Sequence, residues 1–232
     1  MKKYLIGLYT AVILINCDNT TVEEYYNRAI EFEKIEDYET AIRNLNKAIE
    51  KDKFCRSALL NRGYYKSKIG DDLGGIEDYK KILEFDSNNT LALFNMATSY
   101  SNLENTDLAL FFYSKALKTK GALNCNANSR GYMLFNTKFD TKRFDSDMEF
   151  TMPKCEIYFD RGLEYYWLED YNNAISDFQK SLNSNNQIID CYFLIGESNL
   201  AKNDTINACI NYKEASILGL NAASEALNIL CK

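Results

Sequence analysis

A triplet of small, large and small side chains recurs along most of this 232-residue chain. The large residue follows the first small one by four places, and a third, usually small, residue follows three places later; both are helical spacings. The first members are Ala41, Gly75, Ala109, Ala174 and Ala208, and the large members are Leu45, Tyr79, Tyr113, Phe178 and Tyr212. The first three triplets are 34 residues apart, and so are the last two. Such a period indicates stacked units that share one continuous core.

A second small residue lies upstream of each triplet at a fixed offset. These residues are Ala29, Gly63, Ala97, Gly162 and Gly196. An aromatic or aliphatic residue precedes each of them by four places: Tyr25, Leu59, Leu93, Tyr158 and Tyr192. Each unit therefore reads as two amphipathic helices, A and B, joined by a short turn, with small residues where the two backbones approach closely.

This pattern resembles the tetratricopeptide repeat, in which helix A and helix B together take 34 residues. The resemblance implies an all-α fold, a right-handed solenoid of paired antiparallel helices. The clear units span 22–55, 56–89, 90–123, 155–188 and 189–222. Residues 223–232 are expected to form a helix that caps the exposed end of the core.

The segment 124–154 interrupts the period. Arg130-Gly131 stands in register with Arg62-Gly63 of the second unit, which predicts a helix A over about 124–136. The remainder, 137–154, lacks the triplet and contains Pro153, the single proline of the chain. The segment is therefore either a degenerate repeat or an irregular insertion, and the sequence leaves both open.

The N-terminus differs in kind from the repeats. Lys2 and Lys3 precede an apolar run that is too short for a transmembrane helix but suits a secretory signal over residues 1–16. Leu14, Ile15 and Cys17 resemble a bacterial lipobox, although Asn16 departs from its usual small residue. This resemblance implies a lipid on Cys17, with 17–21 as a linker, and a protein of the bacterial cell envelope attached to the inner or outer membrane, facing periplasm or surface. The alternative is an ordinary signal peptide with an incidental cysteine.

Few residues of this chain are suited to catalysis or to metal binding. There is no histidine, and the seven cysteines form no CxxC pair, so the usual catalytic triads and zinc sites are not expected. We expect no enzyme activity, no cofactor and no metal. The net charge of −6 argues against a nucleic-acid partner. The six cysteines after Cys17 could form disulfides, for example between Cys125 and Cys155, but small apolar packing roles in helices are the favoured interpretation.

The resemblance also implies which residues would face a partner. In this family the concave wall is lined by places 2, 5, 9, 12 and 13 of each unit, counted from its first residue. The partner-binding candidates at these places are Tyr26, Leu60, Tyr64, Phe94, Tyr132, Phe159, Tyr166, Trp167 and Phe193. The alternative is that the aromatic and aliphatic residues at place 5 pack between adjacent A helices. Tyr165, at place 11, is expected to pack inward near Ala174.

Taken together, these features predict a membrane-anchored scaffold of the cell envelope that binds a protein or peptide on the concave wall of the solenoid. The alternative is a carbohydrate-binding lipoprotein of a glycan-uptake system, in which exposed aromatic rings stack on sugars.

Overall fold

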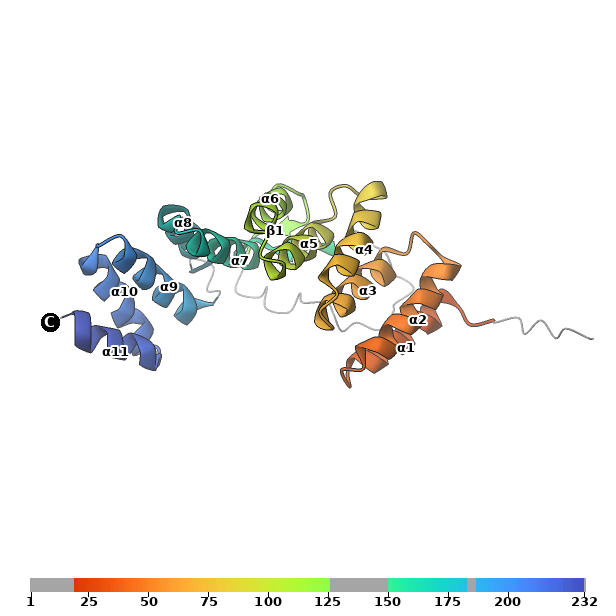
Figure 1. Cartoon of the computed structure of the whole chain (residues 1–232), viewed down its shortest axis with the longest axis horizontal. Coiled ribbons are helices and arrows are strands. Elements are labelled where there is room, and N and C mark those ends of the chain that lie inside the picture. Colours follow the sequence, from red (N-terminus) through yellow and green to blue (C-terminus); the bar gives the residue numbers. More distant parts are fainter. Residues whose placement is uncertain (1–18, 126–149, 183–186, 232) are drawn as a thin grey trace, which may run out of the picture.

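The computed structural model describes residues 19–125, 150–182 and 187–231. These ranges form helices that pack in sequential pairs along an elongated arc, from α1 and α2 at one end to α10 and α11 at the other (Figure 1). The helices are α1 (Val22–Glu33), α2 (Tyr38–Lys51), α3 (Arg56–Lys68), α4 (Asp72–Phe85), α5 (Thr90–Asn102), α6 (Thr106–Ala116), α7 (Lys154–Trp167), α8 (Tyr171–Leu182), α9 (Ile188–Ala201), α10 (Thr205–Ile217) and α11 (Asn221–Leu230). The expected all-α solenoid of helix pairs is confirmed.

The close contact between helices A and B sets the spacing within each pair. A Cβ atom added at Gly63 of α3 would lie 2.6 Å from the Tyr79 ring of α4, which is closer than van der Waals contact allows. The same test at Gly162 gives 2.8 Å to the Phe178 ring. The triplet residues and the small residues upstream of them are almost fully buried, as expected. The residues that repeat in the sequence are therefore the residues of the core.

Every turn from helix A to helix B has the same backbone geometry. The residue at place 15 has a positive φ, and these residues are Glu36, Gly70, Glu104, Glu169 and Asn203. The next residue is always aspartate or asparagine, and its side chain accepts a hydrogen bond from the backbone N–H three residues later, as at Asp37 and Asp71. Each turn therefore ends one helix with a left-handed residue and caps the next.

Helix α7 stacks directly on the third unit, although 31 residues separate the two units in the sequence. Arg161 Nη1 on α7 donates to Ser114 Oγ on α6 at 2.9 Å. Arg62 Nη1 on α3 donates to Asn46 Oδ1 on α2 at 2.7 Å, and both contacts join place 7 of one unit to place 25 of the unit before it. The third and fourth clear units are thus neighbours in the stack.

A second contact supports the same stacking. Tyr65 donates to Glu33, and Ser67 shares a hydrogen bond with Ser99; both contacts join place 12 of one unit to place 10 of the next. Ser101 of α5 donates to Glu164 of α7 in this same register. No described helix lies between α6 and α7, so residues 124–154 connect two adjacent layers of the solenoid. Of the helix expected over about 124–136, only Asn124 and Cys125 lie among the described residues, and these two are not helical.

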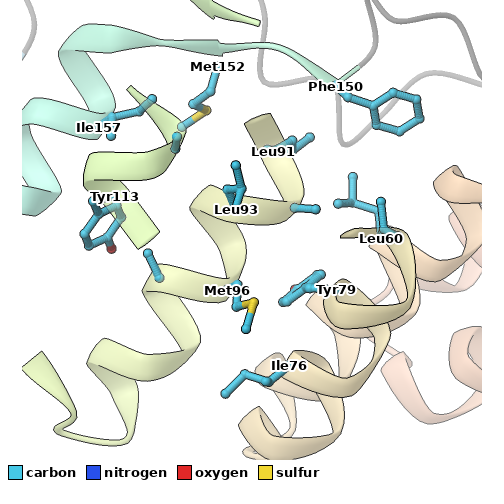
Figure 2. Packing of buried hydrophobic residues seen from close by; sticks show 14 of the residues in the cluster. Leu60, Ile76, Tyr79, Leu91, Leu93, Met96, Tyr113, Phe150, Met152 and Ile157 are labelled. Carbon is cyan, nitrogen blue, oxygen red and sulfur yellow. The ribbon is translucent and has the colours of Figure 1, made fainter. Parts of the chain in front are cut away.

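The residues just before and just after the 126–149 segment are joined to each other. Strand β1 (Ala122–Leu123) pairs in parallel with β2 (Met152–Pro153), and Cys125 forms a disulfide with Cys155. Residues after this segment also pack into the core. Figure 2 shows Met152 and Ile157 close to Leu91 and Leu93 of α5, and the same cluster includes Phe150. This connection therefore fixes α7 against the third unit.

The favoured interpretation, that the cysteines after Cys17 pack as small apolar residues in helices, is wrong for the four that form disulfides. Besides the Cys125–Cys155 bond, Cys209 of α10 is bonded to Cys231, directly after α11. The Cα atoms of the two pairs are 5.9 Å and 5.7 Å apart, which suits a disulfide. Cys55 and Cys191 keep their thiol groups and are buried, in agreement with a packing role.

The last helix covers the end of the core, as expected of a cap. Ala223 of α11 is fully buried against Ala208, Tyr212 and Ala215 of α10. The Cys209–Cys231 disulfide ties the end of this cap to the unit beneath it. No helix in the described ranges is long and apolar enough to cross a membrane.

The turn geometry leads to a stability prediction for Glu104, whose φ is 57°. This conformation costs a residue with a Cβ about 1–2 kcal/mol, whereas the extra backbone entropy of glycine costs about 0.5–1 kcal/mol. We therefore expect Glu104→Gly to raise the free energy of unfolding by roughly 0.5–1 kcal/mol, measured by urea denaturation followed by circular dichroism. Gly70→Ala, at the equivalent place with a φ of 85°, is the opposite control and should destabilise the protein. A loss of stability in Glu104→Gly would contradict the proposed cost of the turn.

Candidate partner-binding surface

The A helices α1, α3, α5, α7 and α9 carry the residues that the sequence assigned to partner binding. The fifth-place side chains of three units are buried: Tyr26 is 8% exposed, Leu60 4% and Phe159 9%. Asn61 Nδ2 of α3 donates to Tyr26 Oη of α1 at 2.9 Å, so the Tyr26 side chain links two adjacent A helices. For these three residues the alternative interpretation, packing between A helices, describes what the structure shows. They offer little surface to a partner.

The other candidates on these helices are partly buried and are held by neighbours. Phe94 lies against Tyr113, with ring centroids 5.6 Å apart, and Phe193 lies against Tyr212 at 5.9 Å. The ring of Tyr64 has the Lys68 ammonium 5.1 Å from its centroid. Tyr132, like Cys17, lies outside the described residues.

The C-terminal end of α7 is different, because it exposes an aromatic group. Trp167 is 73% exposed. Its ring meets Tyr166 edge to face at 5.4 Å, and Tyr166 in turn meets Tyr171, the first residue of α8, at 5.9 Å. We call Tyr166, Trp167 and Tyr171 the aromatic patch. The sequence pointed to Tyr166 and Trp167, whereas Tyr171 joins them only because the turn brings α8 back beside α7.

Tyr165 is less buried than its place in the unit predicts. It packs against the cluster that contains Ala174, but it is only partly buried. The guanidinium of Arg161 lies 5.7 Å from its ring centroid. Since this arginine also bonds Asp177 and Ser114, the ring serves as one wall of a polar contact between helices.

Charge changes sign along the A helices. The α3 helix carries four basic residues and no acid: Arg56, Arg62, Lys66 and Lys68. The α5 helix carries no charge. The α1 helix carries four acids, Glu23, Glu24, Glu31 and Glu33. The other acids are on α7 and α9: Glu156, Asp160, Glu164, Asp190 and Glu197. The two bases of α7 are Lys154 and Arg161, and α9 has none. The charge composition of the A helices therefore changes from acidic in α1 to basic in α3, uncharged in α5 and acidic in α7 and α9.

Asp160 is a carboxyl group without a nearby cation in the described structure. Burial raises its pKa from the ordinary 3.8 to about 7, and the carboxylates of Glu156 and Glu164 add to the shift. Asparagine occupies this place in the first three units, at Asn27, Asn61 and Asn95. The aspartate at the same place in the fourth stacked unit departs from this pattern and is visible in the sequence.

Glu197 of α9 links the acidic region to the aromatic patch. Tyr212 Oη donates to Glu197 Oε1 at 2.6 Å, which fixes the carboxylate. Burial raises the pKa of Tyr166, and the Glu197 carboxylate raises it further. The charge of Glu197 is therefore close enough to act on the patch.

Comparison with known proteins agrees with this geometry. The tetratricopeptide repeat model matches residues 91–122 and 156–188, which are the third and fourth layers of the stack. Solved structures of MamA, PilF and YrrB share the architecture over most of their length. The fold is a tetratricopeptide-repeat (TPR) solenoid.

The similarity in sequence is low. MamA of Desulfovibrio magneticus RS-1 is 17% identical, with a TM-score of 0.66 over 85% of this chain and 94% of that one. PilF of Pseudomonas aeruginosa is 17% identical, with a TM-score of 0.65 over 89% and 80%. YrrB, described as a TPR protein with an unusual peptide-binding site, is 16% identical, with a TM-score of 0.63 over 89% and 91%. At these identities the structures show the fold alone.

One curated relative is a TPR repeat-containing protein of Methanocaldococcus jannaschii. It is 24% identical over 79% of this chain. The chain spans 34% of the length of that protein. This similarity supports the presence of the repeats in the TPR solenoid and does not extend to an activity.

The raised pKa of Asp160 leads to a prediction about pH. Between its ordinary pKa of 3.8 and its folded pKa of about 7, the folded state keeps a proton that the unfolded state has released. Stability therefore falls as pH rises through this window. We expect Asp160→Asn, which installs the residue of the first three units, to stabilise the protein at about pH 8 by about 1–3 kcal/mol and to have little effect near pH 4.

Urea denaturation at several pH values measures this difference. Asp190→Asn is the matched control, since Asp190 is an exposed acid one A helix away, and it should change stability little at either pH. An Asp160→Asn effect that is equal at low and high pH would contradict the assignment to Glu156, Glu164 and burial.

Proposed function

We propose that this protein is an exported scaffold that binds partner proteins along its A helices and is held at a bacterial membrane by a lipid on Cys17. The observation that carries the binding part is the exposure of Trp167. A tryptophan that is 73% exposed contributes little to the core, and tryptophan is among the residues that most often dominate protein interfaces. An exposed aromatic group at the end of a rigid helix is suited to anchor a partner.

The architecture supports binding rather than catalysis. A TPR solenoid presents long, regular surfaces that stay rigid because each layer is clamped by its neighbours. YrrB, which shares the fold, is described as having a peptide-binding site, although fold similarity alone does not transfer that property. In the described ranges no group of three or more cysteine, aspartate or glutamate side chains is arranged to hold a metal ion.

Two observations support export. Disulfides form and persist in oxidising compartments, and the structure contains two of them, Cys125–Cys155 and Cys209–Cys231. The sequence Leu14 to Cys17 resembles a lipobox and follows a short apolar run. These features are independent, because the disulfides lie in the repeats and the lipobox precedes them. Together they favour the cell envelope.

The binding of carbohydrate is a second candidate, since the same exposed tryptophan could stack on a sugar ring. The aromatic patch is small, however, and its rings meet edge to face. We therefore favour a protein partner and retain the glycan as an outcome of the test.

A photo-reactive amino acid at Leu168 tests the partner-binding surface. Leu168 is 48% exposed and directly follows Trp167, so its replacement leaves the patch intact. We expect protein adducts in intact cells that are lost when Trp167→Ala is added. The matched control is the same group at Phe111 of α6, which is 57% exposed on a B helix and should give no such adduct.

Three outcomes would contradict a protein partner at this surface: no adduct at Leu168, equal adducts at both positions, or adducts at Leu168 that persist with Trp167→Ala. Binding to a glycan array that is lost with Trp167→Ala, without any protein adduct, would support the carbohydrate alternative.

Metabolic labelling with an alkyne-bearing fatty acid tests the anchor. We expect the full-length protein, expressed in a bacterial host, to incorporate the label and to fractionate with membranes, because the thiol of Cys17 is the acylation site. Cys17→Ser should lose the label and the membrane association. Asn16→Gly is the matched control and should be labelled at least as well as the wild type. Label retained by Cys17→Ser would overturn this assignment.

A further inference from the structure

Several aromatic rings of this protein have a cation of the same chain beside them. Lys53 lies 5.0 Å from the Phe54 ring centroid, and Lys68 lies 5.1 Å from that of Tyr64. The rings of Tyr25, Phe150, Tyr158 and Tyr165 are covered in the same way by lysine or arginine. Other exposed rings, such as Phe111 at 57%, have no such cation in the described ranges.

The aromatic patch also belongs to the rings without such a cation. No lysine or arginine of the described ranges lies over the rings of Tyr166, Trp167 or Tyr171. Tryptophan binds cations better than tyrosine or phenylalanine does, because its ring has the strongest negative face. The best cation acceptor of the chain is therefore exposed, and no cation of the described ranges lies over it.

Acidic residues lead along α7 to this patch. Glu156, Asp160, Glu164 and Trp167 follow one another at steps of four, four and three residues, which places them on one side of the helix. In the described ranges Asp160 carries no ion pair, but burial raises its pKa to about 7, so it keeps its proton up to about that pH. Glu164 is 5% exposed and is held by the hydroxyl of Ser101. Glu156, which is partly exposed, is therefore the acid of this row that a partner can reach.

The bases nearby are committed to other groups. Arg161 of α7 donates to Asp177 Oδ2 at 2.7 Å and to Ser114, so its charge is directed toward α8 and α6. Lys154 lies 3.4 Å from Asn124 Oδ1, at the opposite end of α7. Lys202 directly follows α9, and its positive charge acts on Asp204. On the patch side, Glu197 is fixed by Tyr212 and lies close to Tyr166.

From these contacts we infer that the aromatic patch, together with Glu197 beside it and Glu156 further along α7, binds a lysine- or arginine-bearing segment of a partner protein, with one basic side chain on the face of Trp167. This inference rests on the proposed function and adds the chemistry of the partner. The cation lies against the indole ring, and the following basic residues of the segment run along α7 toward Glu156. Charge complementarity selects this occupant: an acidic segment would be repelled by Glu197 and Glu156, and a purely apolar one would leave these carboxylates unused.

Trp167 is the single tryptophan of the chain, so its fluorescence reports directly on this site. We expect hexaarginine and hexalysine to change the emission of the full-length protein in a saturable way, whereas hexaglutamate and a neutral glycine–serine hexapeptide do not. Equal responses to basic and acidic peptides would overturn the inference, and so would the lack of any response to the basic ones.

Fluorescence anisotropy of labelled hexaarginine separates the ring from the general charge. Trp167→Leu keeps every acid, and the loss of a cation–π contact worth about 0.5–2 kcal/mol corresponds to about 2- to 30-fold weaker binding. Glu197→Gln should also weaken binding. The matched control is Phe54→Leu, since Phe54 is 56% exposed and already has Lys53 at its ring; its affinity should equal that of the wild type. Unchanged affinity in Trp167→Leu would overturn the inference by showing that charge alone attracts the peptide.

The outcomes also distinguish this inference from the proposed function. If basic peptides fail to bind while protein adducts at Leu168 still depend on Trp167, the partner is not basic and the scaffold function stands. If basic peptides bind Trp167 but no protein adduct forms, the cation site stands and the proposed partner does not.

Discussion

The structure depends on one close contact, the approach of helix A to helix B at a residue with little or no side chain. Where Gly63 meets the Tyr79 ring, even a methyl group would overlap with the ring. The ring fills the groove beside the contact and is only 1% exposed. Because each unit repeats this arrangement, each presents the same surface to the next, and the layers stack without adjustment. The positions of the A-helix side chains, including Trp167, follow from that regular stacking.

The polar contacts between layers follow the same register. Arg62 bonds Asp78 on helix B of its own unit and Asn46 on helix B of the unit before it. Arg161 makes the equivalent contacts with Asp177 and Ser114. Asp78 is fully buried, and the Arg62 guanidinium and the Lys66 ammonium compensate its charge. Such a buried pair contributes more to the choice of one register than to net stability, since desolvation offsets much of the attraction. It is this register that identifies α7 as the layer directly after α6.

The period of the sequence predicted the helix pairs, the core residues and the capping helix, because each of these is set by contacts that recur within one unit. Features that depend on two distant segments could not be predicted in this way. The period does not favour the Cys125–Cys155 bond, since it says nothing about where the chain lies after a segment without repeats. The burial of Tyr26 and Phe159 depends on the neighbouring A helix. The place of these residues within their unit therefore does not decide between packing among A helices and contact with a partner. Tyr171 joined the patch through the geometry of a turn. The signals that could have been used were Asp160 at an asparagine place and the aspartate or asparagine at place 16 of every unit.

The parallel pairing of β1 with β2, together with the disulfide beside it, has a consequence for how this solenoid can vary. The Cα atoms of Cys125 and Cys155 are 5.9 Å apart, so the residues just before and just after the 126–149 segment lie at almost the same point. The number of residues between these two points is thereby uncoupled from the phase of the repeats. A repeat array ordinarily gains or loses whole units, whereas this junction can accept an insertion of any length while the surfaces before and after it keep their alignment. The linear count of repeats and the number of layers in space can then evolve separately.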